Sequence, residues 1–129
     1  MRAVVLREFG DVGNAKVDDF PDPEPGPGEV LIRVQAVAAN FVDLLVIGGK
    51  YQFLPDLPFV PGKGPAGIVA DVGRDVTNVS PGDRVLAMAE QGGYGELVTA
   101  PAINVFKLPG SLSFVDAASM SLVYDTAWF

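Results

Sequence analysis

Glycine and proline divide this chain into short pieces and so limit the folds that are open to it. The 129 residues include 15 glycines and 11 prolines. Proline lacks the N–H that a helix interior or a central strand uses, and glycine weakens both kinds of element. The apolar residues therefore occur in short runs bounded by turn residues. This pattern predicts a mainly β fold, a partly open β-barrel rather than a helical bundle.

Alternation of apolar and polar residues is clearest over residues 29–38, EVLIRVQAVA. The even-numbered positions are all apolar, namely Val30, Ile32, Val34, Ala36 and Ala38. Charged or polar residues occur only among the odd-numbered positions. Such a pattern is typical of a half-buried antiparallel strand.

Shorter β segments are predicted on either side of this strand. They are RAVVLREF and NAKVDDF, which form an opening hairpin, and then AGIVADVG, SPGDRVLAMA, GGYGELVTAP and AINVFKLP. Pro81 and Gly82 suit the two central positions of a type II turn. From Gln52 to Pro65, inclusive, four prolines predict an irregular loop.

Two helices are predicted. A short one covers residues 41–47, with Asn40 at its N-cap and Asp43 in its first turn, where the helix dipole favours a negative charge. A longer one covers residues 114–129, with Ser113 as its cap and apolar residues at helical spacing. No glycine, proline or basic residue closes the second helix after Trp128 and Phe129. We therefore expect the chain to be a fragment of a longer protein.

Two residue types are missing altogether, because the sequence contains neither cysteine nor histidine. Disulfides, ordinary zinc sites, cysteine or serine–histidine nucleophiles and histidine acid–base chemistry are excluded. The net charge is −7 and no basic stripe is present, so nucleic acid is not an expected partner. No apolar run is long enough to span a membrane, and the N-terminus lacks an export signal, so we expect a cytoplasmic protein.

Gly62, Gly64 and Gly67 spell G-x-G-x-x-G, a pattern known from dinucleotide-binding folds. That fingerprint must follow a buried strand and open a helix, whose free N–H groups hold the phosphate. Here the preceding stretch is LPDLPFVP, and a β-branched segment follows. The context therefore favours a structural role, in which these glycines let two backbones approach closely at a barrel corner.

A family resemblance rests on residues from the same region. Gly62, Gly67, Gly73 and Val76 have the spacing of the signature G-H-E-x-x-G-x5-G-x-x-V of zinc-containing alcohol dehydrogenases in the medium-chain dehydrogenase/reductase superfamily. The stretches NFVD, GGKY, VSPGDRV and GGYGELV resemble the zinc-independent quinone oxidoreductase branch. The resemblance covers residues 1–129 and implies that they form the N-terminal GroES-like catalytic domain of that superfamily.

The departures from the zinc-binding pattern are informative. The histidine and glutamate of the signature are replaced by Lys63 and Gly64, and the cysteine and histidine of a second motif fall on Asn40 and Phe41. The loop that holds a structural zinc would lie near residues 89–94, which are too few to contain it. The resemblance therefore implies no metal site. The family's Rossmann cofactor-binding domain is absent from this chain, so we expect the chain alone to be inactive.

The resemblance implies hydride transfer from NADPH or NADH, with the protein supplying orientation and polarisation. A zinc ion would polarise a simple carbonyl, and its loss shifts that task to the substrate. A quinone or an α,β-unsaturated carbonyl can spread the arriving charge over a conjugated system. We therefore expect reduction of such substrates. A full-length homo-oligomer is also expected. The alternative is a stand-alone GroES-like binding module of the co-chaperonin type.

Four residues are candidates for the site. Asn40 is the first, either as a donor to the substrate or nicotinamide or as a helix cap. Tyr51 matches a cleft tyrosine of the family or is a barrel-rim aromatic, and Lys63 lends positive charge to the cleft or is solvated. Thr126 matches a threonine near the nicotinamide. Asp43 is expected to support the fold by accepting backbone or arginine hydrogen bonds, and Tyr94 to pack.

Overall fold

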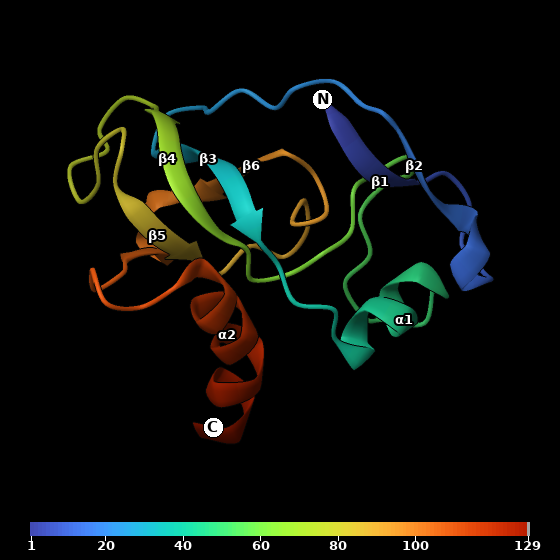
Figure 1. Ribbon diagram of the computed structural model, residues 1–129. Helices are drawn as coiled ribbons and strands as arrows, with labels where there is room; N and C mark the ends of the chain where they lie inside the picture. The colour runs from blue at the N-terminus through green and yellow to red at the C-terminus, as the bar shows by residue number, and fades with distance from the viewer. Residues whose placement is uncertain (129) are drawn as a thin grey trace.

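The structure is a computed structural model that describes residues 1–128. Within this range the strands form a two-stranded sheet and an open five-stranded sheet, and two α-helices extend from the same side of them (Figure 1). The mainly β, partly open architecture predicted from the glycine and proline pattern is confirmed.

The elements have the following bounds. The strands are β1 (Arg2–Leu6), β2 (Ala15–Asp19), β3 (Glu29–Ala36), β4 (Ala66–Val72), β5 (Arg84–Ala87), β6 (Leu97–Pro101) and β7 (Val105–Lys107). The α-helices are α1 (Phe41–Ile47) and α2 (Phe114–Trp128). A 3-10 helix, Val12–Asn14, lies between β1 and β2, and another, Ala102–Asn104, lies between β6 and β7.

The five-stranded sheet has the strand order β6-β3-β4-β5-β7, and every neighbouring pair is antiparallel. The alternation predicted for β3 is confirmed, because Val30 and Ile32 are fully buried while Arg33 is exposed. These side chains join the main core with apolar residues of β4, β5, β6 and β7. The sheet is thus a well-packed base for the segments that lead from it to α1 and α2.

The strand β3 ends at Ala36, two residues earlier than the alternation predicts. Ala36 is paired with Ala66, the first residue of β4. The residue before Ala66 is Pro65, which has no N–H to donate to a further ladder bond. Residues beyond Ala36 therefore leave the sheet and lead to α1.

The helix α1 has the predicted bounds. The Asp43 carboxylate accepts a hydrogen bond of 2.8 Å from the backbone N–H of Asn40, which satisfies a donor at the helix start. Val46 and Ile47 pack against Leu6 and Phe59, so the helix is attached to the N-terminal sheet. This packing holds Asn40 at the head of α1.

The helix α2 packs below the five-stranded sheet, against β3, β4 and β5 (Figure 1). Ser113 Oγ accepts the N–H of Asp116 at 3.0 Å, so the predicted cap is confirmed. Ala117 and Ala118 are buried against Ala66. Most of the helix beyond Leu122 is exposed, and Trp128 is 88% exposed. The predicted last residue, Phe129, lies outside the described residues.

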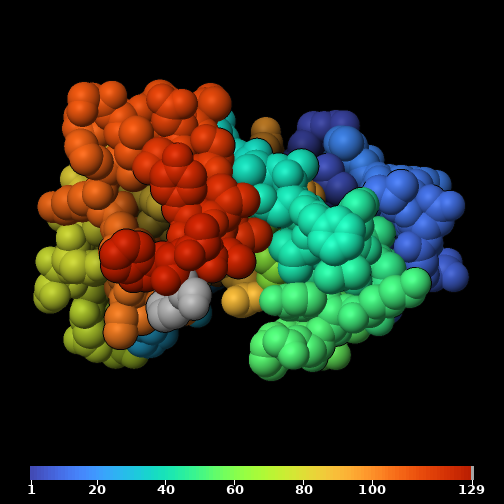
Figure 2. Space-filling model, turned by 90° about the horizontal axis from the view of Figure 1, so that it is seen from below, coloured from blue at the N-terminus to red at the C-terminus, as the bar shows by residue number. Residues whose placement is uncertain are grey.

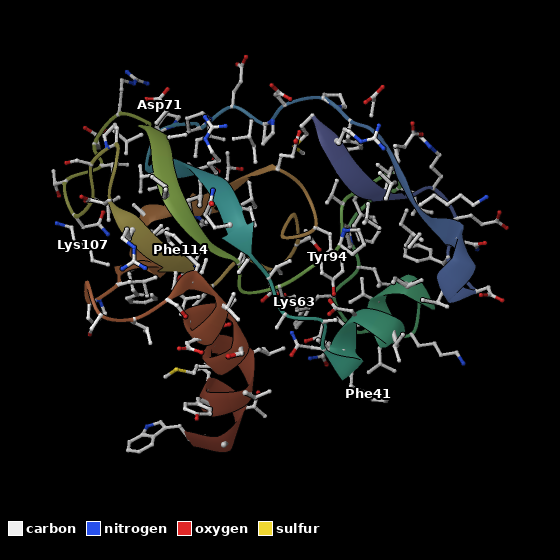
Figure 3. All side chains as sticks on the ribbon, in the orientation of Figure 1. Phe41, Lys63, Asp71, Tyr94, Lys107 and Phe114 are labelled. Atoms are coloured by element: carbon white, nitrogen blue, oxygen red, sulfur yellow. The ribbon has the colours of Figure 1, made fainter. Side chains whose placement is uncertain are left out.

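Arginine contacts fix the entry to α2. The Arg84 guanidinium donates to the carbonyls of Pro109, at 3.1 Å, and Leu112, at 2.6 Å. It also lies 4.5 Å from the centre of the Phe114 ring, which Figure 3 shows at the top of the helix. The planar guanidinium thus joins β5 to the segment that leads into α2.

The predicted type II turn is also confirmed, because the Asp83 N–H donates to the Ser80 carbonyl at 3.1 Å and Gly82 has a φ of +94°.

None of the helices within residues 1–128 combines the length and apolar character needed to cross a lipid bilayer.

Candidate active site

A groove of about 400 Å³ lies between α1 and α2. Figure 2, seen from below, shows the hollow between the red α2 and the cyan and green region that contains α1. The lining residues come from the two helices and from the N-cap of α1, namely Asn40, Phe41, Val42, Leu122, Val123, Thr126 and Ala127. Small-molecule sites typically have this size and combine apolar walls with a few polar groups. Asn40 and Thr126 are the polar groups here.

Asn40 stands where β3 gives way to α1. Its side-chain amide donates one N–H to the Ala38 carbonyl at 3.3 Å. An amide has two N–H groups, and the second one has no hydrogen-bond partner among residues 1–128. Asn40 therefore has a donor available beside the groove, in addition to its position at the helix cap.

Thr126 is an exposed residue near the end of α2, and it lines the same groove as Asn40. The two residues are 86 positions apart in the sequence, so the tertiary structure is what brings them together. The predicted cofactor pair, Asn40 and Thr126, thus shares one groove.

Lys63 and Tyr51 form a second group, together with Glu90. Lys63 is only 7% exposed. Its Nζ donates to Glu90 Oε2 at 2.7 Å and to the Glu90 carbonyl at 2.9 Å. It also lies 5.0 Å from the centre of the Tyr51 ring. Figure 3 shows Lys63 between the sheet and α1. The alternative of a solvated lysine is therefore wrong, because the ammonium is buried and paired.

Glu90 is a site residue that the sequence does not reveal. It is separated from Lys63 by 27 positions, and no motif in the sequence links the two. Its side chain is 72% exposed, so one carboxylate oxygen reaches inward from the surface. Glu90 also lines a hollow of about 530 Å³, together with Gln52, Phe53, Leu54, Pro55 and Gln91.

A buried carboxylate supports the α1 end of the site. Asp43 is 4% exposed, and its Oδ2 accepts the Tyr94 hydroxyl at 2.7 Å as well as the Asn40 N–H. Its Oδ1 is buried without a hydrogen-bond partner among residues 1–128. The expectation that Asp43 accepts backbone or arginine hydrogen bonds is confirmed through the backbone N–H of Asn40, and the Tyr94 hydroxyl is a further partner that the sequence did not predict. The expected fold-supporting role of Asp43 agrees with these contacts.

Tyr94 packs beside Val60, as expected of a packing residue, and its hydroxyl adds the bond to Asp43. Burial raises the pKa of this hydroxyl, and the hydrogen bond to Asp43 and the negative charge of that carboxylate raise it further. The hydroxyl therefore keeps its proton and remains a donor at neutral pH.

The three glycines of the G-x-G-x-x-G stretch have a packing role. They precede and begin β4, not a helix. A Cβ at Gly67 would collide with the Arg33 carbonyl of the paired strand, and one at Gly64, where φ is +65°, would collide with Ser121 Oγ of α2. The expectation of close backbone approach is confirmed. No helix N-terminus is formed here for a phosphate.

Together, these features define a small β domain with an open sheet and a groove between two helices. A comparison with protein families matches residues 26–110 to the alcohol dehydrogenase GroES-like domain. This match covers more than half of the chain. The chain belongs to this family, in the medium-chain dehydrogenase/reductase superfamily, and the resemblance read from the sequence is confirmed.

Curated relatives agree with this assignment. The chain is 41% identical over 128 residues to a quinone oxidoreductase-like protein 2 homolog of Nematostella vectensis, with 98% of the chain and 35% of the relative covered. It is 38% identical over 130 residues to the synaptic vesicle membrane protein VAT-1 homolog of Homo sapiens, with 99% of the chain and 33% of the relative covered. The chain thus spans about a third of the length of these relatives.

A solved structure has the same fold. The Escherichia coli quinone oxidoreductase, crystallised in complex with NADPH, superimposes with a TM-score of 0.92 at 28% identity. The match covers 99% of this chain and 39% of that protein. A nicotinamide cofactor is therefore found within the family.

Proposed function

We propose that residues 1–129 form the substrate-side domain of a zinc-independent oxidoreductase that uses NADPH or NADH to reduce quinones or α,β-unsaturated carbonyls. The observation that carries the proposal is the groove between α1 and α2, where two polar side chains meet apolar walls. Relatives named quinone oxidoreductase support this substrate class. The complex of the Escherichia coli enzyme supports NADPH as the cofactor.

The donor set supports a zinc-free reaction. The part of the chain that the structure describes contains no group of three or more histidine, cysteine, aspartate or glutamate residues placed to hold a metal. The position that corresponds to a zinc ligand carries Lys63, whose protonated amine has no lone pair for a metal and is already bonded to Glu90. These residues do not fit zinc.

The described residues fit one end of a nicotinamide cofactor. Thr126 offers its hydroxyl, and Asn40 its side-chain oxygen, to the carboxamide of the cofactor in an apolar groove. The glycine-rich stretch offers no helix N-terminus for its phosphates. We therefore assign the phosphates to a nucleotide-binding domain elsewhere in the full-length protein. When bound, the cofactor supplies a hydride to an electron-poor carbon.

The task of this chain is to bind, orient and polarise the substrate. Apolar side chains from α1 and α2 accept a ring or alkene and exclude water from it. The free N–H of Asn40 donates to the carbonyl oxygen, where negative charge develops during reduction. A conjugated substrate spreads that charge, so hydrogen-bond donors are sufficient to stabilise it.

Turnover of matched substrates by the full-length protein tests the proposal. The assay follows NADPH and NADH oxidation with a quinone and an enone, and the reverse reaction with simple primary alcohols. We expect turnover with the quinone, the enone or both. Turnover confined to the alcohols would refute the proposal.

A further inference from the structure

The environment of Lys63 is unusual for a lysine. It lies in the stretch 61–67, every residue of which is buried. An ammonium in such a place needs a compensating negative charge. The carboxylate of Glu90 supplies this charge from the surface and accepts a hydrogen bond of 2.7 Å from Lys63 Nζ. The main-chain carbonyl of Glu90 accepts a second hydrogen bond from Nζ at 2.9 Å. Two of the three N–H groups of Lys63 are thereby fixed.

The ion pair is not needed to join the two segments that carry it. Main-chain hydrogen bonds already connect them, from Gly92 to Val60 at 2.7 Å and from Gly93 to Gly62 at 3.0 Å. A buried ion pair is often no more stable than apolar side chains of similar size. We therefore expect a methionine at position 63 to fill the space without a large loss of stability. Stability alone therefore does not explain why position 63 carries a charged side chain.

The third N–H of Lys63 is the free one. It has no hydrogen-bond partner among residues 1–128, and the ammonium lies on the Tyr51 ring. Glu90 itself lines the hollow of about 530 Å³ beside Phe53 and Leu54. The ammonium is thus held by one fixed carboxylate, close to a hollow whose other walls are uncharged.

We propose that Glu90 is a positioning residue, which holds the Lys63 ammonium against Tyr51 so that its remaining N–H donates to the same substrate oxygen as the Asn40 N–H does. This inference rests on the proposed reduction of a conjugated carbonyl. As that oxygen gains negative charge, a charged donor stabilises it more than a neutral amide does. No proton has to leave Lys63 for this effect.

Nuclear magnetic resonance on the 129-residue chain tests the positioning without any cofactor. We expect the ¹⁵N signal of the Lys63 ammonium to be visible in the wild type, because its hydrogen bonds slow proton exchange, and to be lost in Glu90→Gln. The variant Glu8→Gln, which removes an exposed charge from the N-terminal hairpin, should leave the signal in place. An unchanged Lys63 signal in Glu90→Gln would overturn the positioning role.

Kinetics of the full-length protein test the catalytic part. We expect Glu90→Gln and Lys63→Met to lower kcat for a quinone at least about tenfold with little change in KM, whereas Glu8→Gln keeps the wild-type value. The double exchange of Lys63→Glu with Glu90→Lys should be more thermally stable than either of these two substitutions alone. It should not recover the wild-type kcat. Full recovery of kcat in the exchanged protein would show that the pair is only structural.

These outcomes separate the two proposals. Wild-type turnover with quinones or enones, together with an unchanged kcat in Lys63→Met, would overturn the role of Lys63 alone. Absence of turnover with every conjugated carbonyl would remove the proposed function and this role with it, whatever the resonance signal shows.

Discussion

At the scale of single residues, the buried carboxylate of Asp43 connects the cap of α1 to the turn that carries Tyr94. The Tyr94 hydroxyl and the Asn40 N–H share Oδ2, while Oδ1 has no partner among residues 1–128. Burying a carboxylate is costly unless hydrogen bonds compensate for lost water. Each of the two bonds is therefore important for keeping Asn40 in place.

Removal of the tyrosine hydroxyl should destabilise the domain. We expect Tyr94→Phe to lower the free energy of unfolding by about 1–3 kcal/mol, because a buried charged acceptor loses a partner. Urea denaturation followed by circular dichroism measures this change. The control is Tyr124→Phe on the exposed face of α2, which should have no measurable effect. Equal stabilities for the two variants would contradict the importance of the bond.

The same bond predicts a pH dependence. The pKa of Tyr94 is raised in the folded state, while an unfolded tyrosine loses its proton near pH 10. The stabilising contribution is therefore fully present below pH 10 and decreases as the pH rises above that value. Between about pH 10 and 11 we expect a steeper loss of stability in the wild type than in Tyr94→Phe. Parallel curves would exclude this linkage.

Sequence patterns predicted only part of this arrangement. The position of Asp43 three residues after Asn40 is a local signal, because both belong to one helix start. Tyr94 lies 51 positions away from Asp43, and Glu90 lies 27 positions from Lys63. Pairings of this kind depend on which loops meet in three dimensions, so a single sequence does not show them.

At the scale of elements, strands and helices were predicted well because each has a local signal. The alternation in β3, the caps at Asn40 and Ser113, and the Pro81–Gly82 turn are all read within a few residues. The strand order β6-β3-β4-β5-β7 has no such signal. The groove between α1 and α2 has no local sequence signal either, because it depends on how two different sheets place these helices.

Close packing of the segment before β4 against α2 is testable at Gly64. We expect Gly64→Ala to destabilise the domain more than Gly82→Ala does, although both glycines have positive φ. At Gly82 nothing lies within 4 Å of an added Cβ, so only the conformational cost of about 1–2 kcal/mol applies. At Gly64 the added Cβ also meets Ser121 Oγ.

A second substitution serves as the control for this collision. Ser121→Ala removes the hydroxyl and leaves the Ser121 Cβ 3.4 Å from the added atom, an ordinary contact. Combined with Gly64→Ala, it should restore part of the lost stability, as measured by a double-mutant cycle of unfolding free energies. Additive effects of the two substitutions would show that Ser121 is not the obstacle.

At the scale of the whole molecule, the chain covers about a third of its relatives. The described residues offer a groove for a small ring but no helix N-terminus at the glycine-rich stretch. A cytoplasmic location and a homo-oligomeric full-length form stay predictions. We propose that this chain contacts only the nicotinamide end of the cofactor and that another domain holds the phosphates. This chain alone should therefore bind NADPH weakly.

Calorimetric titration of the 129-residue chain with NADPH measures that consequence. We expect a Kd no tighter than about millimolar, because only the nicotinamide end has partners here and a binding free energy of about −4 kcal/mol corresponds to that value. The full-length protein serves as the positive control. Micromolar affinity of the chain itself would show that it holds the phosphates too.

The central claim is that the groove at Asn40 is where the substrate is polarised. Asn40→Ser tests it most directly, because serine caps a helix as well as asparagine does but lacks the amide donor. In the full-length protein we predict an unfolding free energy equal to that of the wild type and a kcat for quinone reduction about 10²-fold lower. An unchanged kcat in this variant would contradict the claim and leave Asn40 as a helix cap only.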